Sequence, residues 1–381
     1  MVKKLGLMCA LLALGACAKD FDAEVAGRQV VEARHTGTSA PVASTPPSEA
    51  PPGTLERRVL DLASCQLEGH QIVDTCAAMT ALRHELASPG GSKELSLALG
   101  TSLLRHRAPA VRIEAAKLMG SDLASRLAIV DTARREAVPA VRQAYVQLLA
   151  DEGARLPPVA RFLLESADHP TAAVRLDALD ALTAPVNRGM PGGAAKIVAM
   201  VEGDPDVRVR RAACALGGKL GDATLVPMYA RQTATTADPE LHAACMEGLV
   251  AMFHNPPVFD TASEPAYRLF LERLAAQPRS EQSPPWSVMS TFCYFSHDAD
   301  LDQLAAWKLR APWFDAAEVK RVITSVITDK ATSWMARAAA VESLVGLGAT
   351  RVELAALRAA HDPKDPGDRQ VLAKIDSALG E

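Results

Sequence analysis

Apolar positions recur along the chain in a pattern that repeats about every 30 to 35 residues. In five segments, apolar or small residues occupy positions 1, 5, 6 and 8 or 9, which is the spacing of one buried face of an amphipathic helix. The first positions of these segments are 30, 33, 35 and 32 residues apart. They are Val111, Val141, Val174, Val209 and Leu241. The pattern predicts a tandem array of helices, and similar segments return at 336–344 and, more weakly, at 368–379.

Helix-start signals lie directly before the striped segments. Proline comes two or four residues earlier, where a helix needs no backbone N–H. These prolines are Pro109, Pro139, Pro170, Pro205 and Pro239. Asp168, Asp204 and Asp238 are nearby and are candidate N-caps. Second helices are expected between the stripes, over 121–132, 159–165, 194–201 and 223–231. Each repeat is therefore predicted to be a helical hairpin, and because no hairpin buries its stripe alone, neighbours must stack.

The striped segments carry a family signature. The sequence of residues 111–119, Val-Arg-Ile-Glu-Ala-Ala-Lys-Leu-Met, resembles the Val-Arg-x-x-Ala-Ala-x-x-Leu-Gly pattern of bacterial HEAT-like repeats. The resemblance covers residues 70–250 well. It implies an all-α fold, a right-handed α-solenoid in which the second helices line a concave face. The family also includes bilin lyases, but no residue here points to a chromophore or to any other cofactor.

The first residues have the features of an export signal. Lys3 and Lys4 precede an apolar run of twelve, Leu5–Ala16, which is too short to span a bilayer. The run ends in Leu-Gly-Ala-Cys17, which resembles the lipobox of bacterial lipoproteins. In that family the peptide is cut before the cysteine, which then carries the lipid. Residues 1–16 are therefore predicted to be a lipoprotein signal peptide and Cys17 the lipidated residue, with an ordinary signal peptide as the alternative. No Asp follows Cys17, which in the family implies the outer membrane, facing the periplasm or the cell surface.

The rest of the chain divides by composition. Residues 17–53 have no helical period and are rich in Ala, Pro, Ser and Thr, which predicts a disordered tether. Regular repeats are expected over 54–250, irregular aromatic-rich helical repeats over 251–335, and further HEAT-like repeats over 336–381. The 49% share of apolar residues is enough for a large core, although only 4% of residues are aromatic.

Charge limits the range of partners. Lys and Arg number 41 against 45 Asp and Glu, a net charge of −4. Loss of the two lysines in residues 1–16 leaves −6. A nucleic-acid binder would show a basic surplus, so none is expected. The expected contacts are an unidentified protein partner and the membrane through the lipid, with the chain otherwise monomeric.

An arginine follows most of the stripe starts. The column consists of Arg112, Arg142, Arg175, Arg210 and Arg337, with His242 at the fifth repeat. One interpretation is an anion-binding strip. The favoured one is structural, in which each arginine bonds an Asp or a backbone carbonyl in its own or a neighbouring turn.

Twelve of the sixteen aromatic residues fall in 251–335, where the period breaks. Aromatic side chains dominate binding hot spots, so a partner or ligand site is one hypothesis for this segment. Its candidate residues are Trp286, Tyr294, Trp307 and Trp313. The favoured alternative is that irregular helix packing needs large side chains to fill gaps.

The cysteines offer one plausible bridge. Cys65 and Cys76 flank a turn at 66–71 and could staple the terminal hairpin. Cys214 and Cys245 lie on the stripes of adjacent repeats, and bridging requires their Cα atoms within about 7 Å. Buried free thiols are the preferred interpretation of this second pair.

Catalytic and metal-binding motifs are absent from the sequence. The histidines have no zinc-type spacing, and a lone His84-Glu85 step does not make a di-iron site. Asp298-x-Asp300-x-Asp302 begins like a calcium loop, but Gln303 takes the glycine position, which favours a helix cap. No metal site and no catalytic residue are therefore predicted.

The leading functional hypothesis is a membrane-anchored, non-enzymatic scaffold for protein–protein interaction in the bacterial envelope. The alternative is an enzyme or enzyme-regulatory subunit with a site in an aromatic-rich groove near residues 286–314. A purely structural envelope protein is a third possibility.

Overall fold

The computed structural model describes residues 50–51, 53–89, 93–254, 263–276, 313 and 315–380. The chain divides into two units, Met1–Glu49 and Ala50–Glu381. The predicted signal peptide, Cys17 and most of the predicted tether lie outside the described residues. So do Trp286, Tyr294, Trp307 and the segment Asp298–Asp302.

The second unit is built of helical hairpins stacked in sequence order, so the predicted all-α solenoid is confirmed. The N-terminal helices are α2 (Leu55–Asp61), α3 (Ala77–Ala87), α4 (Leu97–Leu103) and α5 (Pro109–Leu118). The central helices are α6 (Leu123–Ala133), α7 (Pro139–Leu149), α8 (Pro157–Ser166), α9 (Ala172–Thr183), α10 (Gly193–Gly203), α11 (Val207–Gly217), α12 (Val226–Thr235) and α13 (Pro239–His254). The later helices are α14 (Ser263–Ala276), α17 (Ala316–Thr328), α18 (Trp334–Gly346), α19 (Arg351–Ala359) and α20 (Pro366–Leu379).

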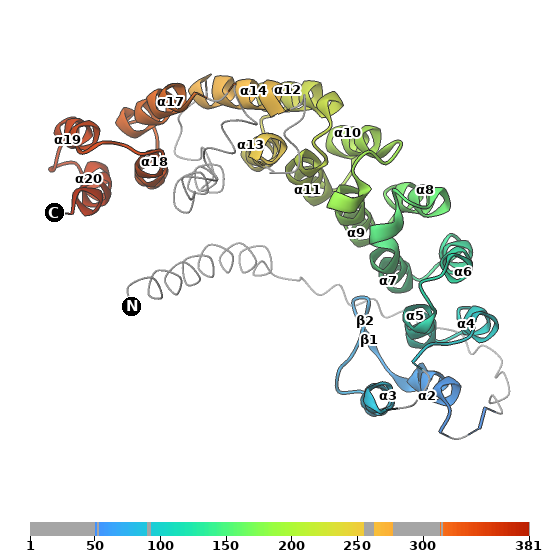
Figure 1. Cartoon of the computed structure of the whole chain (residues 1–381). Coiled ribbons are helices and arrows are strands. Elements are labelled where there is room, and N and C mark those ends of the chain that lie inside the picture. The colour runs from blue at the N-terminus through green and yellow to red at the C-terminus, as the bar shows by residue number, and fades with distance from the viewer. Residues whose placement is uncertain are drawn as a thin grey trace. The chain divides into compact units, whose positions relative to one another are not determined.

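The hairpins of the second unit follow a curved row with an inner and an outer line of helices (Figure 1). The striped helices α5, α7, α9, α11 and α13 form the inner line, and α4, α6, α8, α10 and α12 form the outer one. This corrects the expectation that the second helices line the concave face. Helices on the inside of a bend must approach closely, and the striped helices carry the small residues that permit this.

Local sequence explains where the inner helices begin. Pro109, Pro139 and Pro239 each take the first position of a helix, where the missing N–H costs nothing. Asp238 caps α13 by accepting the backbone N–H groups of Glu240 and Leu241 at 3.0 and 3.2 Å. Of the other two predicted caps, Asp168 pairs with Lys196 at 2.6 Å, and Asp204 pairs with Arg175, as described below.

The closest approach in the described core is between α11 and α13. A Cβ on Gly218 would lie 1.8 Å from the backbone oxygen of Gly248, and a Cβ on Gly248 would lie 2.1 Å from the oxygen of Cys214. The two glycines therefore allow the helices to touch backbone to backbone. Buried Tyr229 completes the contact by donating its hydroxyl to the Cys214 oxygen at 2.8 Å.

This close approach brings Cys214 and Cys245 into a disulfide with a Cα–Cα distance of 4.7 Å. The expectation of two free thiols was wrong, because the glycines shorten the distance that seemed too long for a bridge. The second disulfide joins Cys65 and Cys76 at a Cα–Cα distance of 5.7 Å. It encloses a two-stranded antiparallel hairpin, β1 (Leu67–Glu68) and β2 (Gln71–Ile72), in place of the simple turn that was expected.

The aromatic residues that the structure describes in 251–335 pack mainly into the core. Phe253, Tyr267 and Phe270 are fully or almost fully buried. The Phe253 ring lies edge-to-face with Tyr267 and tilted against Phe270, with ring centroids 5.7 and 5.6 Å apart. Trp313 is half-buried, and its ring lies 5.0 Å from that of Tyr267. At this point the aromatic side chains fill the space between α13, α14 and α17.

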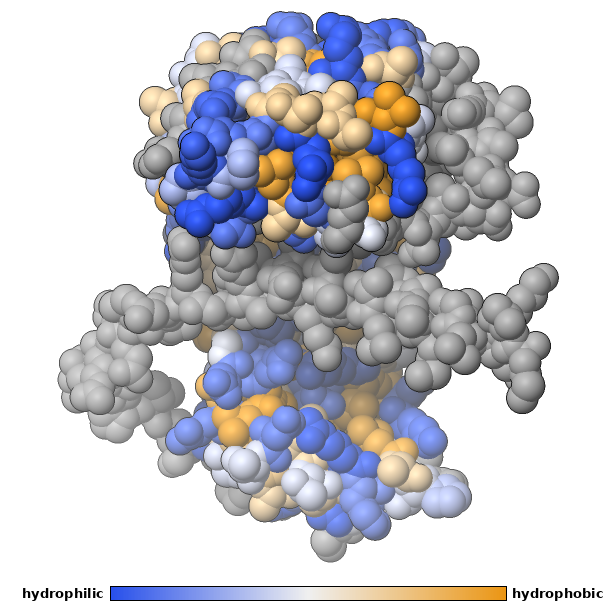
Figure 2. All heavy atoms as spheres, turned by 90° about the vertical axis from the view of Figure 1, so that its left-hand side faces the viewer, coloured by the Kyte–Doolittle hydropathy of each residue, from blue (hydrophilic) through white to orange (hydrophobic). Residues whose placement is uncertain are grey.

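One face of the second unit shows how polar and apolar residues are distributed on its surface. In the view onto the C-terminal end of the row, hydrophobic areas are interrupted by hydrophilic residues (Figure 2). Among the described residues, no helix combines the length and the apolar character that crossing a bilayer requires.

Candidate functional site

The loops that lead from each outer helix to the next inner helix follow one another along one edge of the row, here called the loop edge. It includes loops 104–108, 134–138, 167–171, 204–206 and 236–238. The arginine column lies at this edge, because its residues occupy the first turns of the inner helices. The loop edge therefore collects most of the charged residues that the sequence singled out.

Arg175 and Asp204 make the most complete of these contacts. The guanidinium donates from Nε and Nη2 to the two carboxylate oxygens, both at 2.7 Å, and both side chains are buried. Arg175 Nη1 also donates to the backbone oxygens of His169 and Pro170 at 2.8 and 3.1 Å. Asp204 Oδ1 accepts the Asp206 N–H at 2.8 Å. This bidentate pair ties the start of one inner helix to the loop that enters the next repeat.

Arg112 repeats the arrangement two repeats earlier. Its Nε and Nη2 donate to Glu136 at 2.8 and 2.9 Å, and its Nη1 donates to the oxygens of His106 and Arg107. Glu136 Oε1 accepts the Val138 N–H at 2.8 Å. The Glu136 carboxylate thus bonds both Arg112 of the previous repeat and the backbone of its own turn.

A third buried pair lies in the C-terminal repeats. Arg337 Nη1 lies 2.6 Å from Asp368 Oδ1, and the Asp368 side chain is fully buried. Burial pushes the pKa of Asp368 upward, but the hydrogen bond from the Asp362 N–H and the ion pair with Arg337 outweigh it and lower the pKa to about 2. The carboxylate is therefore ionised throughout the physiological range.

The fourth member of the column bonds a backbone carbonyl, which is one of the two kinds of partner expected for it. Arg210 Nη1 donates to the Asp204 oxygen at 2.7 Å. In this repeat the neighbouring Arg211 makes the ion pair to the next loop, since it pairs with Asp238 at 3.0 Å and also contacts Glu240. The sequence pattern did not single out Arg211.

Arg142 has the weakest set of partners in the column. Its side chain is buried, yet it contacts only Ser166 Oγ at 3.4 Å and the Arg134 oxygen at 3.5 Å, with its guanidinium 5.3 Å from the centre of the Phe162 ring. In the next loop, His169 occupies the position that Glu136 and Asp204 hold elsewhere. Burial lowers the pKa of Arg142. Among the described residues no carboxylate bonds Arg142 directly, although the charges of Glu165 and Glu136 act to raise its pKa.

His106 and His169 occupy equivalent loop positions. Each accepts the backbone N–H two residues later through Nδ1, from Ala108 and Thr171, both at 3.1 Å. Since an Nδ1 that accepts carries no proton, both rings are neutral. Burial lowers the pKa of each histidine, and nearby arginines lower it further: Arg107 and Arg112 beside His106, and Arg142 and Arg175 beside His169.

A groove of about 480 Å³ lies between loops 104–108 and 131–138 and is here called the basic groove. Arg105, Arg107 and Arg135 are exposed along it. Arg135 pairs with Asp131 at 2.8 Å. In the part of the chain that the structure describes, the side chains of Arg105 and Arg107 make no ion pair and no hydrogen bond.

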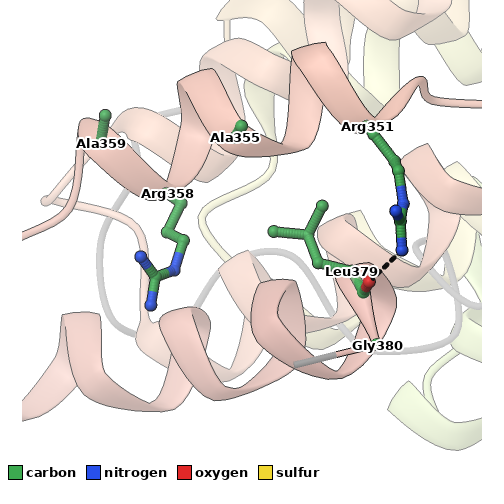
Figure 3. Close-up of a pocket in the computed structure, with 6 residues that line it drawn as sticks. All are labelled: Arg351, Ala355, Arg358, Ala359, Leu379 and Gly380. Atoms are coloured by element: carbon green, nitrogen blue, oxygen red, sulfur yellow. Dashed lines mark hydrogen bonds between the residues drawn. The ribbon is translucent and has the colours of Figure 1, made fainter.

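A second groove, of about 580 Å³, lies between α19 and α20 (Figure 3). Arg351 donates from Nη2 to the Leu379 oxygen at 2.8 Å. Arg358 donates from Nε to Asp376 Oδ1 at 2.6 Å. Both lining cations are therefore used to hold the last hairpin together, and the groove carries no acid–base pair.

The described residues supply no metal centre, since no group of three His, Cys, Asp or Glu side chains among them is arranged to hold an ion. The segment near 286–314, to which the alternative enzyme hypothesis assigned a site, is described only at Trp313. What the described surface offers is hydrogen bonding and charge along the loop edge.

Comparison with known proteins finds similar solved structures. No protein-family model and no curated protein sequence matches the chain. Among similar solved structures is the complex of CpcE and CpcF of phycocyanin lyase from Nostoc sp., at 15% sequence identity and a TM-score of 0.34. The match covers 77% of this chain and 97% of that one. Against the prediction of a chain without enzymatic activity, this similar structure belongs to a lyase. The helical-repeat fold of the chain is shown by its own described helices.

Proposed function

We propose that the chain is a protein-binding α-solenoid held at the bacterial cell envelope by a lipid on Cys17. The observation that carries the proposal is the continuous inner line of helices α5, α7, α9, α11 and α13. Stacked repeats of this kind present one extended surface that no single hairpin could offer. Such a surface fits an extended partner better than a small molecule.

The inner line is pre-organised for binding by contacts between its helices. Gln143 of α7 donates to Asp177 of α9 at 2.6 Å, and Gln147 donates to the same carboxylate at 3.2 Å. The buried pair of Arg175 and Asp204 joins α9 to the loop before α11. A surface fixed in this way loses little conformational entropy when a partner binds.

Two further features support a location in the envelope. Disulfides persist in oxidising compartments, and the second unit contains two of them. The pattern before Cys17 resembles a lipobox.

Photo-crosslinking in the native envelope tests the proposal. A benzoylphenylalanine residue replaces Gln147 or Ala173, which are exposed on the inner line, or Arg161, which is exposed on outer helix α8. We expect the two inner positions to capture the same protein and the outer position to capture none of it. Capture of no specific protein, or equal capture from Arg161, would overturn the proposal.

The anchor has its own variant in the same experiment. Cys17→Ser removes the thiol that would carry the lipid, so the protein should leave the membrane fraction. Membrane retention of this variant, measured by fractionation and blotting, would rule out the lipid anchor while leaving the crosslinking result intact.

A further inference from the structure

The basic groove carries positive charge that the protein itself does not neutralise. Arg105 and Arg107 are exposed, and they make no ion pair with the described residues. The other two arginines of the groove are neutralised, since Arg112 pairs with Glu136 and Arg135 with Asp131. The groove thus carries a surplus of two positive charges in a chain whose net charge is negative.

This surplus lies at one end of the loop edge. In the three loops that follow, the described carboxylates are already paired with basic side chains: Asp168 with Lys196, Asp204 with Arg175, Asp206 with Arg208 and Asp238 with Arg211. Charge complementarity therefore favours the basic groove, with its exposed Arg105 and Arg107, as the place where an acidic ligand binds.

The lining of the groove favours a polypeptide as that ligand. Ala137 is exposed and Val138 is partly exposed where they line the groove beside the arginines, so a ligand meets apolar contacts as well as charge. Guanidinium groups bind carboxylates through paired N–H donors. A nucleic acid needs a row of cations for its successive phosphates, and in the loops that follow the described basic side chains are already paired with carboxylates, which disfavours it.

We propose that the basic groove binds an acidic, extended segment of the partner protein, with its carboxylates on Arg105 and Arg107. The proposal rests on the proposed function, since it assigns a chemistry to part of the same partner. A segment that alternates acidic and small apolar residues matches the alternation of charged and apolar groups in the groove.

A binding measurement on the purified full-length lipidated chain in detergent tests the chemistry. The probe is a fluorescein-labelled peptide of alternating glutamate and alanine, followed by fluorescence anisotropy. Arg105→Ser/Arg107→Ser should weaken binding about tenfold, since each exposed charge pair contributes up to about 1 kcal/mol. Added salt should weaken binding to the unchanged protein.

The matched control is Arg155→Ser/Arg369→Ser, which makes the same change in charge at two exposed arginines outside the groove. It should leave peptide affinity unchanged. Equal weakening in both variants would overturn the proposal, as would tighter binding of tripolyphosphate or single-stranded DNA than of the peptide. Thermal unfolding of both variants checks that each is folded.

Crosslinking separates failure of this proposal from failure of the proposed function. With benzoylphenylalanine at Ala137, the captured partner peptide should be acidic, and Arg105→Ser/Arg107→Ser should abolish its capture. If Ala137 captures nothing while Gln147 and Ala173 capture a protein, only the groove assignment is wrong. Capture of a second copy of this chain at Ala137 would also overturn it. Capture at none of the positions would end both proposals.

Discussion

Arg175 and Asp204 form a buried bidentate ion pair that joins the start of α9 to the loop before α11. The two residues are 29 positions apart in the sequence, close to one repeat length. The pair lies at the contact between one hairpin and the next, so each hairpin supplies one of its two charges. Its removal therefore measures how much one repeat depends on its neighbour.

Arg175→Met should lower the free energy of unfolding by about 3 kcal/mol, because it leaves the Asp204 carboxylate buried without a counter-charge. Arg175→Met/Asp204→Leu should recover part of that loss by removing the stranded charge. Urea unfolding followed by circular dichroism gives both values. The control is Arg208→Met, whose ion pair with Asp206 is exposed and should be worth less than about 1 kcal/mol. Equal losses for Arg175→Met and Arg208→Met would contradict this account.

His169→Asp should stabilise the protein. It would place a carboxylate in the loop position that faces Arg142, as Asp204 faces Arg175, and an aspartate can still accept the Thr171 N–H. The expected gain is about 1 kcal/mol, the usual net value of one hydrogen bond in a folded protein. The comparison variant His169→Ala removes the acceptor and should be destabilising. If His169→Asp and His169→Ala lower the melting temperature equally, a carboxylate beside Arg142 does not stabilise the protein, and the prediction is wrong.

Stability should fall as the pH drops through 6.5, the ordinary pKa of histidine. Burial and the column arginines lower the folded-state pKa of His106 and His169, so the unfolded chain binds protons first. Their contribution is complete above the unfolded pKa and is lost between it and the lower folded-state value. Protonation also removes the Nδ1 acceptor from the turn.

Urea midpoints across that pH range test this prediction. His106→Asn/His169→Asn keeps an acceptor but cannot titrate, so its midpoint should depend less on pH. Some dependence should remain, because burial also lowers the pKa of His242. An unchanged slope in the double variant would show that the acid sensitivity arises elsewhere.

Gly248→Ala should destabilise the protein by about 1 to 3 kcal/mol, the usual range for overpacking a core. The new Cβ would lie 2.1 Å from the Cys214 oxygen, so α11 and α13 would have to separate. Gly203→Ala is the matched control, because no atom lies within 4 Å of its Cβ position. A similar melting temperature for both variants would mean that the two helices are not as close as described.

The repeat architecture could be predicted because it rests on local patterns. The stripe period fixed the inner helices, and Pro109, Pro139 and Pro239 marked their starts. These signals act within one helix, so they are readable without knowledge of neighbours.

Features that depend on distances between helices could not be predicted in the same way. The Cys214–Cys245 bridge follows from the approach that Gly218 and Gly248 permit. The glycines follow the cysteines by four and three residues, which is a signal that could have found the bridge. Whether Arg210 or Arg211 pairs with Asp238 depends on how α11 is rotated about its axis. The inner position of the striped helices depends on the curvature of the whole row.

The claim on which the functional proposals depend is that neighbouring hairpins stabilise one another. Hydrogen–deuterium exchange of the full chain with Arg175→Met, compared with Arg208→Met, tests it most directly. The prediction is faster exchange in both α8–α9 and α10–α11 for Arg175→Met, with α19–α20 unchanged. Exchange that rises only in the turns beside residues 175 and 204, leaving the helices protected, would contradict the mutual dependence of the repeats.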